Sequence, residues 1–407
     1  MPVLRNIGVL ATCRGEGGQG EVHEVAHAAL AWTDDTIRWV GPAHTLPPAY
    51  RGWDAIDAGG RLVIPGLVDC HTHLAFGGWR ADEFSQRLTG RSYQEIAAAG
   101  GGILATVRVT RDASEMELVA RAARFLDGMV ALGVTTVECK SGYGLSLNEE
   151  LKLLRIYRAL QGRHAVRIAP TLLAAHALPP EYRDDRSSYL DLVVDELIPA
   201  VAAAGLAEAC DVFVEKGAFT VDEGRRVLLA GRAGGLAARI HADQLSVSGG
   251  ALLAAEVGAR SADHLECVTP TGIRALADAR VVAVSLPLAT LYLGQRPMPA
   301  RDLIGAGVHV AVATDFNPGS APTYDLPLAM MLACTLQRMT PAEALKGATL
   351  YAAQAVGRMD DIGSLEAGKK ADFAVIDASD PTQWLYHFRP NACVMTVIGG
   401  RVAWANA

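Results

Sequence analysis

The spacing of apolar residues divides the chain into three parts. In residues 1–63 and 358–407, apolar and polar residues alternate over short stretches such as AHAALAWTDDTIRWV and CVMTVIGGRVAWAN. This alternation is typical of half-buried strands joined by tight turns. Asp34-Asp35 and Gly399-Gly400 are the predicted turns. We expect the two chain ends to form one small β-sandwich domain together.

Residues 64–357 have a different pattern, in which short apolar runs alternate with longer stretches of helical period. Helices are predicted within SEMELVARAARFLDGMVALG and LNEELKLLRIYRALQG. The apolar runs are predicted strands, and their ends lie near His73, Lys140, His176, Glu215, His241, His264, Leu286 and Asp315. Eight strands that alternate with helices predict an α/β fold, a distorted (β/α)8 TIM barrel.

One glycine-rich segment, GEGGQG at residues 15–20, fits the Gly-x-Gly-x-x-Gly pattern of dinucleotide-binding sites. Such a site requires a helix that begins at the last glycine. The residues that follow, EVHEVAHAALAW, are more typical of a strand. We therefore interpret the segment as a loop.

Histidines lie at several of the predicted strand ends, where barrel enzymes place their active sites. His71 and His73 follow the first apolar run, and residues two apart in an extended segment point to the same face. Further polar residues end later strands: His176, His241, His264 and Asp315. A lone histidine is more often a hydrogen-bonded core residue, and we interpret three others in that way: His164, His309 and His387.

Imidazole nitrogens and carboxylate oxygens are ligands of metals such as zinc, and catalytic sites leave one position open for water. The predicted metal ligands are His71, His73, His241 and Asp315. A catalytic metal lowers the pKa of its water to about 7, and Asp315 is placed to share a proton with that water. His264, which this set does not need, is predicted to polarise a substrate carbonyl or to stabilise an oxyanion.

Composition narrows the class of protein. Of the 407 residues, 50% are hydrophobic and 20% charged, which suits a globular protein with a large core. The net charge of -7 argues against a nucleic-acid partner, and no apolar run is long enough to span a bilayer. The seven cysteines form no Cys-x-x-Cys pair, and the N-terminus has no secretory leader. We expect a cytoplasmic protein with neither a membrane nor a nucleic-acid partner.

Longer motifs carry a family resemblance. PGLVDCHTHL, IHAD, SADHLE and ATDFNPGS are similar to the amidohydrolase superfamily. Within it, HTHLAFGGWRADEF, GGGILATVRVTR, TTVECKSGYGL, AAHALPPEY and ATDFNPGSAPT resemble the imidazolonepropionase family, and the resemblance extends to GSLEAGKKADFAVID near the C-terminus. It implies a hydrolase of the third step of histidine degradation, which opens 4-imidazolone-5-propanoate to N-formimidoyl-L-glutamate with one divalent or trivalent ion, zinc or iron. Barrels of this kind commonly pair, so we expect a homodimer.

The resemblance also implies roles for individual residues. The family's metal ligands match the four residues named above, and its substrate-binding residues match Arg80, Tyr143, His176, Gln244 and Ser320, with Asn317 and Gly319 near the product. Arg80 suits the propionate tail because a guanidinium binds a carboxylate through two hydrogen bonds. Some family members have glutamate at position 244. A glutamine cannot act as a base, so we assign the base to Asp315, with His264 as its helper.

Two alternatives remain open. Another cyclic amidohydrolase or aminohydrolase of the superfamily would hold two metals bridged by a carboxylated lysine, and Lys216 is the lysine placed for that role. A non-catalytic scaffold would have kept the barrel and lost the chemistry. Such a chain should lack some ligands, whereas all four are present here.

Overall fold

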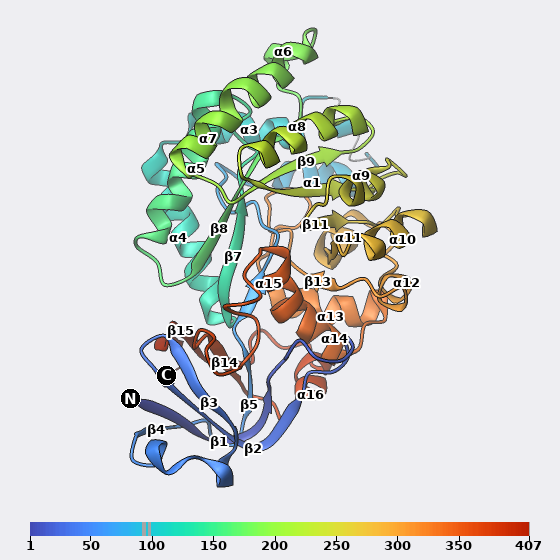
Figure 1. The fold of residues 1–407 in the computed structure, drawn as a ribbon. Helices are drawn as coiled ribbons and strands as arrows, with labels where there is room; N and C mark the ends of the chain where they lie inside the picture. The colour runs from blue at the N-terminus through green and yellow to red at the C-terminus, as the bar shows by residue number, and fades with distance from the viewer. Residues whose placement is uncertain (92–94, 97–98, 407) are drawn as a thin grey trace.

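The computed structural model describes residues 1–91, 95–96 and 99–406. It contains two eight-stranded sheets, one wound into a barrel and the other built from both ends of the chain. Figure 1 shows the second sheet below the barrel, with the blue N-terminal strands beside the red C-terminal ones. Both chain termini lie at this smaller sheet, as the two predicted end regions require.

The barrel strands follow one another around the sheet in chain order, and every neighbouring pair is parallel. They are β6 (Leu67–Asp69), β7 (Val134–Lys140), β8 (Arg167–Ala175), β9 (Ala209–Val214), β10 (Ala237–Ala242), β11 (Ser261–His264), β12 (Val282–Ser285) and β13 (Val310–Val312). Their side chains are almost all buried, which explains the continuous apolar runs in the sequence. The prediction of a (β/α)8 barrel is confirmed.

The barrel closes just beyond the ends of its first and last strands. Thr72 and Phe316 form an isolated parallel bridge. On either side of it, the amide of Asp315 donates to the carbonyl of His71 at 3.0 Å, and the amide of His73 donates to the carbonyl of Phe316 at 2.8 Å. The segments that close the barrel are therefore the ones that carry three predicted metal ligands.

Helices connect the strands and cover the outside of the barrel (Figure 1). They are α1 (Ala81–Leu88), α3 (Ile103–Asp112), α4 (Glu115–Ala131), α5 (Leu147–Gln161), α6 (Arg186–Asp191), α7 (Ile198–Ala204), α8 (Val221–Ala233), α9 (Gly250–Glu256), α10 (Pro270–Asp278), α11 (Pro287–Leu293), α12 (Ala300–Gly305), α13 (Leu326–Gln337), α14 (Pro341–Lys346), α15 (Ala352–Ala355) and α16 (Pro381–Tyr386). Capping boxes begin two of the long helices, with Ser114 and Glu117 at α4 and Thr220 and Glu223 at α8.

The second sheet is mixed and folds back on itself. Its strands are β1 (Pro2–Ala11), β2 (Glu24–Thr33), β3 (Thr36–Pro42), β4 (Asp54–Asp57), β5 (Leu62–Pro65), β14 (Phe373–Ile376), β15 (Cys393–Ile398) and β16 (Arg401–Ala405). Trp32 of β2 and Phe373 of β14 are not on neighbouring strands, yet their rings lie 5.2 Å apart. This contact encloses a separate small core, as a sandwich requires. The turns predicted at Asp34-Asp35 and Gly399-Gly400 join β2 to β3 and β15 to β16.

The glycine-rich segment 15–20 is a loop, as predicted, and it packs against the barrel. The ammonium of the fully buried Lys346 donates to the carbonyls of Glu16, Gly18 and Glu21. The side chain of Gln19 bonds both the amide and the carbonyl of Val310 on β13. The loop is therefore a structural attachment. No helix in the described part of the chain has the length and apolarity needed to cross a bilayer.

Candidate metal centre and substrate cavity

His71 and His73 flank the bridging residue Thr72, so both imidazoles point to one side of the closing segment. Their ring centroids lie 5.4 Å apart, and both side chains are buried. The extended backbone that the sequence predicted here is present, although β6 itself already ends at Asp69. The spacing of the two histidines therefore places both rings at one point inside the barrel mouth.

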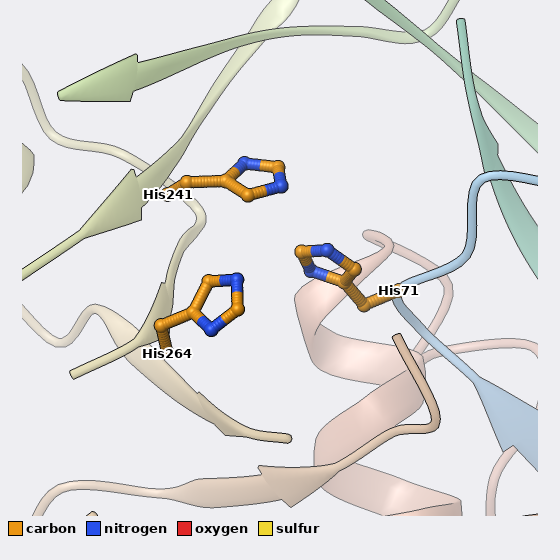
Figure 2. A group of neighbouring side chains, drawn as sticks. All are labelled: His71, His241 and His264. Carbon is orange, nitrogen blue, oxygen red and sulfur yellow. The ribbon is translucent and has the colours of Figure 1, made fainter. Parts of the chain in front are cut away.

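Two overlapping groups of side chains could each hold a metal ion. In one group, candidate ligand atoms of His71, His241 and His264 all lie within 4.8 Å of one another, and Figure 2 shows these three rings converging from separate elements. The other group joins His71 to His73 and Asp315. His71 belongs to both groups. All four predicted ligands are therefore brought together, and His264 stands beside them.

Two carboxylates in the barrel interior orient two of these histidines. Asp263 Oδ2 lies 2.7 Å from Nδ1 of His71, and Asp211 Oδ1 lies 3.1 Å from Nδ1 of His241. A carboxylate at Nδ1 keeps the proton there and leaves the Nε2 lone pair for a metal. Nε2 of His241 is buried and has no hydrogen-bond partner among the described residues. The buried Nε2 of His71 faces Oδ1 of Asp315, another predicted metal ligand, at 3.4 Å. These buried nitrogens fit a bound cation.

The protonation states of the donors also suit a cation. Burial lowers the pKa of His241 to about 3, so its imidazole is neutral near pH 7. Burial opposes the charge on Asp315, but the neighbouring His71 and His73 hold the pKa of this carboxyl well below its usual range. Metals bind neutral imidazole and ionised carboxylate, the forms in which His241 and Asp315 are present. Burial also lowers the pKa of His73. Burial opposes the charge on His71, but the carboxylates of Asp263 and Asp315 beside it raise the pKa of this imidazole.

A charged cluster inside the barrel was missed in the sequence. It consists of alternate residues on four strands: Glu138 and Lys140 of β7, Asp211 of β9, Arg239 of β10 and Asp263 of β11. All five side chains are buried. Burial opposes the charge on Asp263, but Arg239 and Lys140 hold the pKa of its carboxyl well below its usual range. Polar residues at every second position of otherwise apolar strands were the signal that could have identified this cluster.

A cavity open to solvent lies at the carboxyl ends of the barrel strands. Ten predicted site residues line it: His73, Arg80, Tyr143, His176, His241, Gln244, His264, Asp315, Asn317 and Ser320. Four apolar residues that the sequence analysis did not single out complete the wall: Ile103, Phe213, Leu245 and Leu293. This lining, which combines polar and apolar side chains, suits a small polar molecule. Of the predicted residues, His71 and Gly319 lie outside the lining.

Arg80 precedes α1 and is only 7% exposed, so it is not a solvated surface arginine. Its Nη1 lies 3.8 Å from Glu83 Oε2, and Oε1 of that glutamate accepts from the amide of Gly102 at 2.8 Å. The guanidinium packs over the backbone of Gly319, where a Cβ would come within 1.1 Å of Nη2. Gly319 thus contributes the space that Arg80 occupies.

The side chain of Asn317 organises the turn after β13. Its Oδ1 accepts from the amides of Gly319 and Ser320, both at 2.8 Å, and its Nδ2 donates to the carbonyl of Asp315 and to Ser320 Oγ. These bonds use both amide hydrogens and both lone pairs. Asn317 therefore holds the turn that presents Asp315 and Ser320 to the cavity.

His176 has a defined tautomer. Its Nδ1 lies 3.0 Å from the carbonyl oxygen of Gly142, which can only accept, so Nδ1 carries a proton. Burial, with the nearby His73 and His241, lowers the pKa of His176 well below its ordinary value. The ring is therefore neutral, and its Nε2 is a hydrogen-bond acceptor. His176 also stacks on His73, with ring centroids 5.0 Å apart.

His264 is held in an uncommon backbone conformation at the end of β11. Its φ is 81°, in the left-handed region that costs energy for residues other than glycine. Nδ1 of the ring lies 3.7 Å from Oε2 of the buried Glu266. Strain of this kind concentrates at functional sites, where surrounding contacts maintain it. The conformation aims the ring of His264 at His71 and His241 (Figure 2).

Several residues lie away from the site. Lys216 is exposed after β9, which argues against a carboxylated lysine bridge at this position. His164, His309 and His387 each have a hydrogen bond, to Asp127, Gln354 and the carbonyl of Gln383. Their placement in the core was wrong, because His309 and His387 are exposed and His164 is only partly buried. Histidine occurs both in protein cores and at hydrated surfaces, and the local sequence does not distinguish the two environments.

Comparisons with known proteins show which proteins this chain is similar to. The amidohydrolase family model matches residues 234–403. The imidazolonepropionase of Geobacillus kaustophilus is 51% identical over 376 residues, which cover 91% of this chain and 89% of that protein. The imidazolonepropionase of Shewanella frigidimarina is 45% identical over 392 residues, 94% of each chain.

Solved structures show the same fold at low sequence identity. E. coli guanine deaminase has a TM-score of 0.76 at 16% identity, with all of both chains covered. An adenosine deaminase from Xanthomonas campestris with bound zinc has a TM-score of 0.71 at 20% identity, covering 98% of this chain and 92% of that one. These neighbours establish the fold alone. On the strength of its close relatives, this chain belongs to the imidazolonepropionase family of amidohydrolases.

Proposed function

We propose that this chain hydrolyses the ring C–N bond of 4-imidazolone-5-propanoate and releases N-formimidoyl-L-glutamate. One observation carries the proposal: one cavity is lined both by members of the candidate metal groups, His73, His241 and Asp315, and by the buried guanidinium of Arg80. The first suits hydrolysis of an amide, and the second suits a substrate with a carboxylate tail. The close relatives bear the name of this activity, which supports the same assignment.

We assign the metal ligands to His71, His73, His241 and Asp315, and the ion to zinc or iron. When bound, the ion would supply positive charge that lowers the pKa of a water molecule and polarises the ring carbonyl. Two observations support this assignment: the buried Nε2 of His241 has no hydrogen-bond partner among the described residues, and Nε2 of His71 faces Asp315. The zinc found in the adenosine deaminase of similar fold is a further argument for zinc.

The remaining cavity residues have proposed roles that follow from their hydrogen-bonding capacity. Arg80 binds the propionate through two parallel hydrogen bonds, and Tyr143 adds a donor. Nε2 of His176 accepts from a ring N–H. Gln244 offers both a donor and an acceptor to the ring, and it stays neutral throughout the physiological pH range.

Asp315 and His264 move and stabilise charge in the proposed reaction. The Asp315 carboxylate accepts a proton from the attacking water as that oxygen bonds to the ring carbonyl carbon. His264 donates a hydrogen bond to the carbonyl oxygen as negative charge develops there. Asp315 then delivers the proton to the leaving ring nitrogen, and the C–N bond breaks. The carbonyl carbon becomes a carboxylic acid, which loses the second proton of the water to solvent.

The decisive experiment is incubation of metal-replete protein with freshly prepared imidazolonepropionate. Loss of the substrate's ultraviolet absorbance, with formimidoylglutamate as the product, is the expected result. Stable absorbance with a folded, metal-loaded protein would refute the assignment. The family resemblance also implies a homodimer, a proposal that sedimentation velocity can check.

A further inference from the structure

The ammonium of Lys140 lies in the barrel interior, between the carboxylates that orient the predicted metal ligands. The side chain is fully buried. Its Nζ lies 2.7 Å from Asp211 Oδ2, 3.0 Å from Glu138 Oε1 and 3.4 Å from Asp263 Oδ2. An ammonium has three N–H donors, and here each one has a carboxylate partner. Lys140 therefore has no donor left for a substrate.

Two of these carboxylates lead directly to metal-binding histidines. Asp211 uses one oxygen for Lys140 and the other for Nδ1 of His241. Asp263 accepts from Lys140 through the same oxygen that binds Nδ1 of His71. The ammonium of Lys140 thus joins the two carboxylates that orient His71 and His241, although these histidines come from different parts of the barrel.

The two supports depend on Lys140 to different extents. Asp263 keeps other partners if the lysine is lost, because Arg239 Nη2 lies 3.1 Å from Oδ2 and Ser261 donates to Oδ1 at 2.6 Å. For Asp211 Oδ2, Lys140 is the sole hydrogen-bond donor within the described chain. Loss of the ammonium would leave this buried carboxylate free to rotate away from His241.

We propose that Lys140 is a positioning residue for the metal, which acts mainly through Asp211 to hold His241 in its binding orientation. This inference rests on the metal-dependent function proposed above. Residues that orient metal ligands typically contribute about ten- to a hundredfold to metal affinity. A buried ion pair contributes little to the net free energy of unfolding, so stability alone does not explain this cluster, whereas a positioning role does.

The test measures zinc affinity of the metal-free protein by competition with a chromophoric chelator. Lys140→Met should weaken zinc binding about ten- to a hundredfold. Lys346→Met is the matched control, because Lys346 is also fully buried but donates to the backbone carbonyls of Glu16, Gly18 and Glu21 instead of to carboxylates. The control should lower the unfolding free energy and leave zinc affinity unchanged. A folded Lys140→Met protein with wild-type zinc affinity would overturn the proposal.

A double variant covers the case in which Lys140→Met does not fold. Lys140→Met with Asp211→Asn removes one buried cation and one buried anion, so no new uncompensated charge remains. If Lys140 acts through Asp211, the double variant should bind zinc as Asp211→Asn alone does. A further tenfold loss in the double variant would place the action of Lys140 elsewhere and overturn the proposal. Because zinc binding is the readout, this test is independent of whether the wild type opens the imidazolone ring.

Discussion

The guanidinium of Arg80 packs directly against the backbone of Gly319. A Cβ on Gly319 would lie 1.1 Å from Arg80 Nη2 and 1.9 Å from its Cζ. Arg80 follows the first barrel strand and Gly319 follows the last, so this contact crosses the closure of the barrel. The arginine can line the cavity in its observed position because residue 319 has no side chain.

Gly319→Ala should therefore impair substrate binding through Arg80. The added methyl forces the guanidinium out of its position, and a displaced partner for a charged carboxylate costs at least about 1.5 kcal/mol. We expect kcat/KM to fall about tenfold or more, mostly through KM, with bound metal unchanged. Steady-state kinetics and metal analysis provide the check. Wild-type kinetics would show that the carboxylate is bound elsewhere.

Arg80→Met separates recognition of the propionate from the chemistry of the ring. Methionine keeps much of the apolar stem but lacks the forked donors. We expect a loss of about ten- to a hundredfold in kcat/KM for the natural substrate. An imidazolone without the carboxylate, which never used the arginine, should be affected much less. Equal losses for both molecules would mean that Arg80 supports the fold or the transition state instead.

His71→Ala and His73→Ala should both remove metal, but to different extents. His71 belongs to both possible ligand groups, whereas His73 belongs to one. We expect His71→Ala to abolish tight metal binding and His73→Ala to weaken it, with nearly all activity lost in each. Metal content by mass spectrometry, measured on folded protein, distinguishes the two. Retention of metal and turnover in either variant would make that histidine structural.

Gln244→Glu should keep measurable activity, because the family resemblance implies that glutamate is also accepted at this position. Gln244 lines the cavity beside His241 and His264, so a carboxylate there would add a titratable group near the reacting ring. We expect the acid limb of the kcat/KM profile to change, since a protonated glutamate and an ionised one interact differently with the substrate. Complete inactivity with metal and fold intact would show that the neutral amide is essential.

We expect the buried imidazole of His176 to make the unfolding free energy of the metal-free protein depend on pH. Its pKa is lowered by burial in the folded state, whereas an unfolded histidine titrates near 6.5. Below that pH the unfolded chain binds a proton that the folded one does not, so stability falls as the pH falls. The contribution of one such group is at most about 1.4 kcal/mol per pH unit.

His176→Gln removes this group and should make the loss of stability below pH 6.5 shallower. The pKa of His241 is lowered to about 3, so this residue also makes the folded protein less stable as the pH falls, and it remains in the variant. Denaturant unfolding of metal-free wild type and variant between pH 4 and 7 gives the comparison. Parallel curves would contradict the neutral, buried state assigned to His176.

The order of the strands and the set of residues that meet at the barrel mouth could be predicted from the sequence. Apolar runs that alternate with segments of helical periodicity predict a parallel α/β fold such as a barrel. In such a barrel the carboxyl ends of the strands lie at one edge of the sheet. His71, His241 and Asp315 could therefore be assigned to one site, although they are up to 244 residues apart in the chain. Family motifs added Arg80 and the other substrate-binding positions.

Tertiary structure alone decided how these residues are supported. Lys140, Asp211 and Asp263 are far apart in sequence, and their ion pairs exist only because three strands place alternate side chains in the same barrel interior. Likewise, the motif ATDFNPGS does not reveal that Gly319 makes room for Arg80, since that requires the loops after the first and last strands to meet. Spacing along one strand sets the direction of a side chain, but a distance between strands depends on register and closure, which no local pattern encodes.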